Sequence, residues 1–319
     1  MGDIIYGIFA DPFVQMWQMP DFLMQVLWEG FVSGILYALI ALGFVLIFKA
    51  SGIFNFAQGI MVVFSGLTLV GLHELGVPAW LALLLTLATM YALAYSVERL
   101  ILRNLVNQPD IILFMATIGL TNILIGMGQW IFGGETKTMI TKELFLPSGS
   151  SVWEPGGGLV IFQHIDIAAA VIAAALIVGL AFFFSKTKVG RALRAVADDH
   201  QASLSVGISL NHIWVITWFA AGIVALVTGI MWGARSDVSF SLQIIALKAL
   251  PVLVLGGFTS VPGAIVGGLI IGIGEKVFEI YWGSLFGSGV EGWFAYVIAL
   301  VFLLYRPQGL FGEKIIERV

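Results

Sequence analysis

The chain has 319 residues, of which 60% are hydrophobic and only 11% are charged. Because a water-soluble domain usually carries about 25% charged residues, this composition excludes a typical soluble protein and indicates one that lies in a membrane. The formal net charge of −4 gives no reason to expect nucleic acid as a partner, and the lack of cysteine excludes disulfides and thiolate metal sites.

The amino-terminal residues carry Asp3 and Asp11 and lack a basic region, so they do not resemble a cleaved signal peptide. Nine apolar segments follow, at residues 25–48, 53–72, 79–97, 111–132, 167–185, 213–233, 244–258, 264–281 and 293–305. Most of them are long enough to cross a hydrocarbon core about 30 Å thick. The seventh and ninth are short for a full crossing, so we expect eight or nine spans with interrupted or re-entrant helices. The predicted fold is an all-α, polytopic membrane bundle that forms one domain over residues 1–319.

The distribution of Lys and Arg predicts the orientation, because cytoplasmic loops carry an excess of these residues. With the amino terminus outside, most of the 15 Lys and Arg residues lie inside, whereas acidic residues such as Glu74 and Glu135 lie outside. We therefore expect an external amino terminus, a cytoplasmic loop at 186–212 and a cytoplasmic carboxyl terminus.

The longest external connection spans residues 133–164. Its Pro, Gly and Ser residues argue against a buried span, while Trp153 and Phe162 suit the membrane interface. It covers the external mouth, meets an external partner or is an ordinary surface loop, and the sequence leaves these alternatives open.

Two breaks that combine glycine with polar side chains join apolar runs without a polar loop between them. They read SGIFNFAQG at 51–59 and GGFTSVPG at 256–263. Transporters often build substrate sites at interrupted helices, because the freed backbone groups bind polar atoms. Asn55 and Gln58 each supply a carboxamide that both donates and accepts hydrogen bonds, which suits a small zwitterion or amide. The alternative is a tight turn whose polar atoms bond to nearby backbone. Because 53–130 and 246–305 each begin near a break, the two halves are consistent with an inverted internal repeat.

Small residues recur at four-residue spacing, in the pairs Gly30 and Gly34, Gly263 and Gly267, and Gly268 and Gly272. This spacing lets helices approach closely in lipid, so we expect these glycines to pack helices.

Charged residues are rare within the apolar segments. The main exceptions are Glu275 and Lys276, and we expect Glu275 to pair structurally with Lys248. No chain of acids or histidines forms the mid-membrane relay that a proton-coupled carrier usually needs. The four histidines show no metal-ligand spacing, and no phosphate-binding loop occurs. The sequence therefore predicts no catalytic residue, metal site or nucleotide site in this chain.

The polar loop at 186–212 interrupts this apolar sequence, and its length between two spans indicates a docking element. Residues 189–203 predict a short amphipathic helix, which Gly207 is expected to end. Its expected apolar face comprises Ala192, Ala195, Val196 and Ala202, and its charged residues are Arg191, Arg194, Asp198 and Asp199. The alternative is a solvated loop whose basic residues only set the orientation.

Four blocks, at 34–59, 190–209, 247–275 and 305–312, together resemble the permease family of branched-chain amino acid ABC importers. They are most similar to the smaller permease of the high-affinity leucine/isoleucine/valine type. The resemblance implies a bacterial inner-membrane subunit that forms half of a path for branched-chain or related small amino acids. Its implied partners are a second, related permease, two cytoplasmic ATPase subunits, a periplasmic solute-binding protein and membrane lipid. The ATPase subunits would use ATP and Mg, and this chain would bind no cofactor.

The same resemblance assigns the first break to the translocation path and the segment at 190–207 to the ATPase. The expected path residues are Asn55, Phe56, Gln58 and Gly59, and the expected docking residues are Gly190, Arg191, Arg194, Ala195, Asp198 and Gly207. Relatives often read N-F-A-H-G-E at the break, whereas this chain has Gln58 and Ile60 at the His and Glu positions.

Other substrates and classes remain as alternatives. Members of the family also serve urea, amides and small carboxylic acids. Judged from the residues alone, the other classes are an ion-coupled secondary carrier and a membrane-embedded enzyme. The missing ionisable relay argues against the carrier, and the lack of a His, Asp, Glu or Ser cluster argues against the enzyme.

Overall fold

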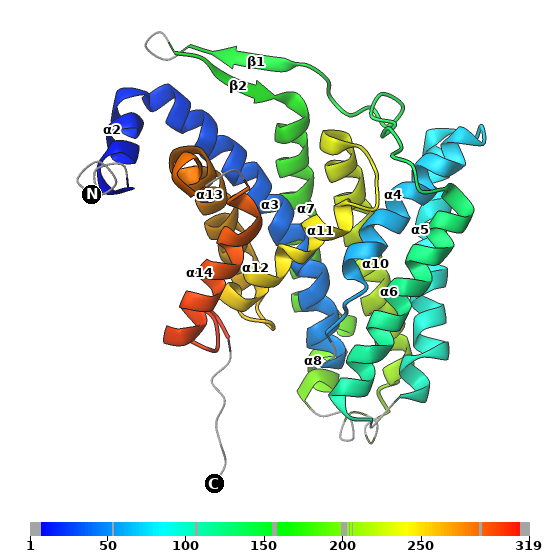
Figure 1. The fold of residues 1–319 in the computed structure, drawn as a ribbon. Helices are drawn as coiled ribbons and strands as arrows, with labels where there is room; N and C mark the ends of the chain where they lie inside the picture. The colour runs from blue at the N-terminus through cyan, green and yellow to red at the C-terminus, as the bar shows by residue number, and fades with distance from the viewer. Residues whose placement is uncertain are drawn as a thin grey trace.

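The computed structural model describes residues 8–52, 54–105, 108–154, 158–198, 203, 205, 207–286 and 289–312. These residues form a helical bundle with a β-hairpin across one end, and helix α8 (Lys188–Asp198) lies at the opposite end (Figure 1). We call these the hairpin end and the α8 end. Among the described residues, six helices are long and apolar enough to cross a membrane. The fold is therefore that of a polytopic helical membrane protein, and the expectation of an all-α chain needs correction only for the hairpin.

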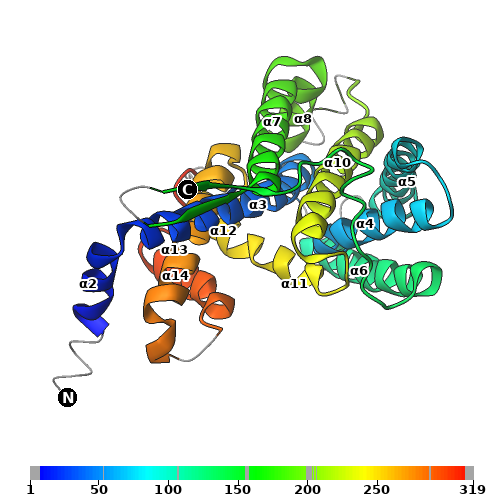
Figure 2. The same cartoon turned by 90° about the horizontal axis from the view of Figure 1, so that it is seen from above.

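Helix α3 (Pro20–Ser51) is the central element of the bundle. It follows the short helix α2 (Asp11–Gln18), and Pro20 stands in its first turn, where a missing N–H costs no hydrogen bond. The stretch from Leu36 to Ile47 is almost entirely buried, since α13 (Val261–Phe286) and α10 (Leu210–Ser236) pack against it. Figure 2 shows α3 running through the middle of the molecule, between the two groups of later helices.

Close contact between α3 and α13 depends on glycine. A Cβ atom at Gly34 would lie 2.8 Å from the carbonyl oxygen of Gly268, and one at Gly30 would lie 2.7 Å from the Cα of Ile273. Gly263 and Gly267 approach the backbone of α12 (Ala249–Gly256) in the same way. The predicted role of these small residues in helix packing is confirmed.

Helices α4 (Gln58–Glu74), α5 (Ala79–Leu100) and α6 (Asp110–Phe132) form the other side of the bundle. A single 3-10 turn (Leu102–Asn104) follows α5. Helix α4 is buried between α10, α5 and α6, which accounts for the small or apolar side chains along most of its length. Helices α5 and α6 expose most of their apolar side chains, as expected for surfaces that face lipid.

The connection at 133–163 is folded rather than loose. Strands β1 (Ser150–Trp153) and β2 (Val160–Gln163) pair antiparallel, with Ser150 opposite Gln163. Phe162 packs edge-on against Trp28 of α3, and an isolated bridge joins Lys137 to Val238. The side chain of Lys137 also forms an ion pair with Glu74. The connection therefore contacts α3 and α4 and pairs with Val238 just after α10, and its role stays open.

Helix α7 (His164–Lys186) leads into α8, and α10 follows. Near the hairpin end, Arg235 of α10 forms a 3.0 Å ion pair with the buried Asp166 of α7. This pair ties the first turn of α7 to the last turn of α10.

The seventh predicted segment is not one helix. It consists of α11 (Leu242–Leu247) and α12, which meet at Lys248. Pro251 in α12 lacks the N–H that would continue the helical hydrogen bonds of α11. Helix α14 (Glu291–Tyr305) then returns beside α12 and α13. Each of the nine predicted segments contains a helix, or two helices in the case of the seventh, although residues 54–57 and 257–258 are not helical. The number of crossings stays a prediction, because α11–α12 and α14 are too short for an upright span and α4, with 17 residues, is at the lower limit.

The carboxyl-terminal residues 306–312 fold back onto the second break. The N–H of Leu310 donates to the Leu255 carbonyl oxygen at 2.8 Å, and that of Phe311 donates to Gly256 at 3.1 Å. Gly257 and Gly309, both with positive φ, let the two backbones touch. This strap explains why the motif at 305–312 accompanies the glycine-rich break at 256–263.

Candidate transport path and docking surface

The first break carries the chain back into the bundle before α4 begins. Gly52 ends α3 in the left-handed conformation (φ 68°). Gln58, the first residue of α4, lies against Gly43, where any Cβ would overlap the carboxamide nitrogen. Gly43 precedes the end of α3 by about 12 Å of helix. The break therefore places the start of α4 deep within the bundle, as predicted for an interrupted helix.

The polar atoms of the break are bonded internally. Asn55 Oδ1 accepts the N–H of Ala57 at 3.1 Å, and Asn55 Nδ2 lies 3.4 Å from Gln58 Oε1. Gln58 Nε2 donates to the Ala221 carbonyl oxygen of α10 at 3.2 Å. Both side chains are 0% exposed. In this conformation the two carboxamides join α4 to α10, which is the arrangement expected of a tight turn with satisfied polar atoms.

The other two predicted path residues make different contacts. Phe56 packs on Phe54 and Phe114, and its N–H donates to Thr117 Oγ1 of α6 at 3.2 Å. Thr117 Oγ1 also lies 3.2 Å from the Phe54 carbonyl oxygen, so one hydroxyl fastens the break to α6. No sequence pattern pointed to Thr117, because a lone threonine in an apolar helix usually bonds to its own backbone, and here too its hydroxyl lies 2.9 Å from the Phe114 carbonyl oxygen.

The two interrupted elements meet at Gly59. A Cβ at Gly59 would lie 2.9 Å from the Cβ of Ala246, so only glycine lets α11 approach the first turn of α4 this closely. Thr259 and Ser260 belong to the second break but lie at its far side, beyond α12. Helix α11 therefore lies against the predicted path residues. The second break, at 256–263, does not.

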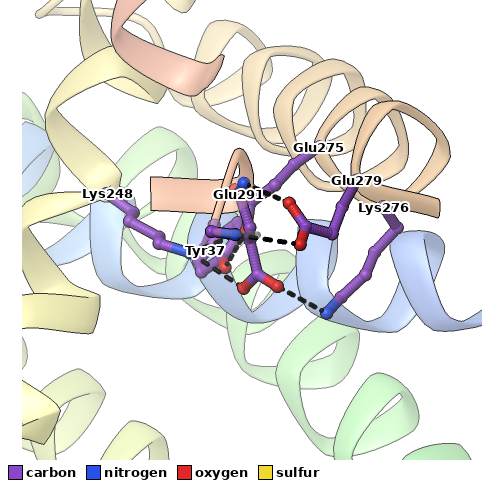
Figure 3. Close-up of polar contacts among 7 residues, drawn as sticks. Tyr37, Lys248, Glu275, Lys276, Glu279 and Glu291 are labelled. Atoms are coloured by element: carbon purple, nitrogen blue, oxygen red, sulfur yellow. Dashed lines mark hydrogen bonds and ion pairs between the residues drawn. The ribbon is translucent and has the colours of Figure 1, made fainter. Parts of the chain in front are cut away.

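A cluster of charged residues lies beside this meeting point (Figure 3). Lys248 Nζ, at the joint of α11 and α12, lies 2.7 Å from Glu275 Oε1 and 2.9 Å from Glu291 Oε1. Lys276 Nζ lies 3.0 Å from the other oxygen of Glu291, and the hydroxyl of Tyr37 donates to Glu275 at 3.2 Å. The predicted pairing of Glu275 with Lys248 is confirmed, and both lysine ammonium groups contact carboxylates.

The cluster joins four helices at about the middle of α3. Tyr37 comes from α3, Glu275 and Lys276 from α13, and Glu291 from the first turn of α14. Glu279 completes it by accepting the N–H of Glu291 at 2.7 Å. Buried charge in a membrane is costly unless it is paired, so this network of ion pairs stabilises the packing of α12, α13 and α14 on α3. Sequence reasoning missed Tyr37, whose partner lies 238 positions away, and Glu291, which stands outside the predicted apolar segments.

Helix α8 packs on α7 through one face. Leu193 and Val196 are buried, and at Gly190 any Cβ would overlap the Phe184 carbonyl oxygen of α7. Arg194 Nη1 donates to that same carbonyl at 2.7 Å and so caps the end of α7. The helix and its amphipathic character are as predicted, but its buried face centres on Leu193 rather than on the alanines.

Some of the predicted docking residues therefore pack against α7, and others face outward. Gly190 is buried, and Arg194 and Ala195 are half-buried, whereas Arg191 is exposed. Gly207 has φ 82°, and the N–H of Ile208 donates to the Ser203 carbonyl oxygen at 3.0 Å, which is a Schellman-type helix end. Helix α8 itself ends at Asp198, and residues 199–202 lie outside the described part of the chain, so a single helix that runs from 189 to a stop at Gly207 stays a prediction. Asp199 and Ala202 lie outside the described residues, and so does the side chain of Asp198.

A membrane bundle in which two interrupted elements meet, with a short amphipathic helix held at one end, has the architecture of the membrane component of a transport system. The family described as "Branched-chain amino acid transport system / permease component" matches residues 26–305, and the chain belongs to this family. It is thus a transmembrane permease subunit of an ABC importer and a multi-pass protein of the inner membrane.

Curated relatives cover nearly the whole chain. The high-affinity branched-chain amino acid transport system permease protein BraD of Pseudomonas aeruginosa is 28% identical over 93% of this chain and 98% of its own length. The corresponding protein LivH of Escherichia coli is 27% identical, with the same coverage. Among solved structures, a chain of PsaBC from Streptococcus pneumoniae, in complex with a Fab, has a TM-score of 0.51 at 15% identity, covering 94% of this chain and 97% of that one. This last likeness concerns the fold alone.

Proposed function

We propose that this permease pairs with a second, related permease and that the two form the path for branched-chain or related small amino acids. The names of BraD and LivH, which match nearly end to end, support this class of substrate. Two ATPase subunits would supply the energy by using ATP and Mg, and a periplasmic binding protein would deliver the solute. We propose no cofactor for this chain itself.

The observation that carries the proposal is the meeting of the two interrupted elements at Gly59 and Ala246. The first of these elements also carries the buried carboxamides of Asn55 and Gln58. The bond from Gln58 to Ala221 is the contact that must break if α4 moves relative to α10. Such a movement would present Asn55, Phe56, Gln58 and Gly59 to the solute, which is their proposed role in the path.

We propose that the α8 end faces the cytoplasm and that α8 docks on the ATPase. Most of the chain's Lys and Arg residues gather at that end, in agreement with the positive-inside rule. Because Gly190 and Arg194 bind α7, they would transmit movement of α8 to the bundle. The exposed Arg191 would then contact the ATPase, while Ala195, Asp198 and Gly207 would shape the rest of the docking segment.

The charged cluster does not favour an ion-coupled carrier. Lys248 is held between two carboxylates and Lys276 contacts one, and the cluster includes none of the path residues. A relay needs groups that exchange protons with the path, whereas this network binds helices to one another.

The proposal is tested by ATP hydrolysis of the purified complex, co-expressed with its genomic neighbours. The panel of solute-loaded binding proteins should include leucine, isoleucine, valine, urea, a short amide and a small carboxylate. Stimulation by a branched-chain amino acid supports the proposed substrate, and stimulation by urea, the amide or the carboxylate instead replaces it with that alternative. Solute movement by the chain alone in liposomes, driven by an ion gradient, would refute the ATP-driven mechanism.

The role of the break is tested separately with Gln58→Leu. We expect uptake to fall while the ATPase still binds, because the substitution removes the contact to Ala221 but leaves α8 intact. Unchanged uptake would remove Gln58 from the path.

A further inference from the structure

A cavity of about 460 Å³ lies at the α8 end, between α3, α7, α8 and the turn that joins α12 to α13. Its inner wall is apolar and includes Leu46 of α3, Leu180 of α7 and Ile265 of α13. The strap at 306–312 closes one side through Phe311. None of the residues assigned to the translocation path lines it, so it is a separate site.

The rim of this cavity is cationic. Lys49, in the last turn of α3, and Arg194 of α8 both line it, together with the hydroxyl-bearing Ser260. No acidic side chain is among its described lining residues. Within the part of the chain that the structure describes, the ammonium of Lys49 has neither an ion pair nor a hydrogen bond.

Arg194 retains donors for a ligand. Its Nη1 binds the Phe184 carbonyl oxygen at 2.7 Å, and its Nη2 lies 3.5 Å from the Ser185 carbonyl oxygen. A guanidinium has five N–H donors, so capping α7 does not exhaust it. The rim thus carries two positive charges that still have free hydrogen-bond donors, which suits an anion.

The depth of the cavity distinguishes a lipid from a soluble anion. Its lining reaches from Lys49 inward to Leu42, about 10 Å along α3. Every wall on this inward side is apolar and belongs to a membrane-spanning helix. A cationic rim above a deep apolar wall matches a phosphate headgroup with an acyl chain beneath it, and basic pockets between membrane helices bind such headgroups.

We propose that this cavity binds an anionic phospholipid, whose phosphate lies between Lys49 and Arg194 and whose acyl chain packs against Leu46 and Leu180. Since Arg194 and Gly190 also hold α8 on α7, the bound lipid stabilises the position of α8. Lipid binding itself is independent of the proposed function, and only its effect on docking rests on that function.

Native mass spectrometry of the delipidated full chain in detergent, titrated with phosphatidylglycerol or phosphatidylcholine, tests the proposal. We expect preferential retention of phosphatidylglycerol. Lys49→Gln should weaken its binding about fivefold, the value for one basic contact near a membrane surface, and Lys49→Arg should restore it. Ala181→Trp, which fills the cavity from α7, should abolish binding. Lys186→Gln and Ala175→Trp, at exposed positions of α7 that do not line it, are the matched controls.

Three results would overturn the proposal. Equal binding of the two lipids would show that the cavity does not select a lipid by its charge. Binding at the wild-type level by both Lys49→Gln and Ala181→Trp would show that the lipid binds elsewhere. Full competition by soluble glycerol phosphate would identify a site for a free anion instead of a lipid. If Lys49→Gln lost the lipid but still bound the ATPase as the wild type does, the proposed lipid site would stand. Only the proposed effect of the lipid on α8 would then be wrong.

Discussion

Replacing Gly34 by alanine tests the close packing of α3 and α13. The added Cβ would lie 2.8 Å from the Gly268 carbonyl oxygen and 2.9 Å from the Cα of Leu269. Ordinary contacts between carbon atoms are about 3.5–4.0 Å, so the helices must separate by the better part of an ångström. Both contacts are with backbone, which cannot rotate away. We expect a loss of roughly 1–3 kcal/mol in the free energy of unfolding, the usual range for overpacking.

The matched control is Gly179→Ala on α7, where an added Cβ meets nothing within 4 Å. There alanine should stabilise the helix by up to about 1 kcal/mol, its advantage in helix propensity over glycine. Unfolding of the full chain in mixed micelles, by titration with sodium dodecyl sulfate, measures both variants. If Gly34→Ala proved as stable as Gly179→Ala, the inferred backbone contact of α3 with α13 would be wrong.

Three further predictions follow from the contacts of single side chains. Lys248→Met should cost about 3–5 kcal/mol in the same unfolding assay, because it leaves the buried carboxylate of Glu275 without an ion-pair partner, whereas Lys142→Met on an exposed loop should cost almost nothing. Thr117→Val should cost about 1–3 kcal/mol, because it leaves the backbone of the first break without a partner; Thr89→Val, at an exposed site, is the control and should behave as wild type. Arg191→Glu should weaken ATPase association in a pull-down while leaving stability unchanged, and equal association would contradict its docking role.

Local sequence patterns predicted the helices well because length and apolarity decide what can cross a membrane. The nine apolar segments and both breaks coincide with their structural counterparts. The hairpin was missed, since Pro, Gly and Ser mark turns but do not show whether the residues between them pair. The joint at Lys248 was missed as well, because one lysine within an apolar run does not reveal a change of helix direction.

Long-range contacts could be predicted only in part. The pair Lys248 and Glu275 was predictable, since opposite charges in neighbouring apolar helices must find partners. Tyr37 was not, because 238 positions separate it from Glu275. The docking prediction for Gly190 is incomplete for a similar reason: a helical pattern shows that α8 has two faces, but only its neighbours decide that Gly190 belongs to the buried one.

The position of the first break also has a consequence for how the protein is made. Helix α4 has 17 residues, which is the lower limit for a transmembrane helix, and its first residue lies against Gly43 inside the bundle. The polar groups of its first turn therefore depend on contacts with other helices. The carboxamide of Gln58 finally bonds to the Ala221 carbonyl oxygen, which lies more than 160 residues later in the chain. Until α10 has been synthesised and inserted, water or the insertion machinery must satisfy that amide, so the break reaches its final form late in biogenesis.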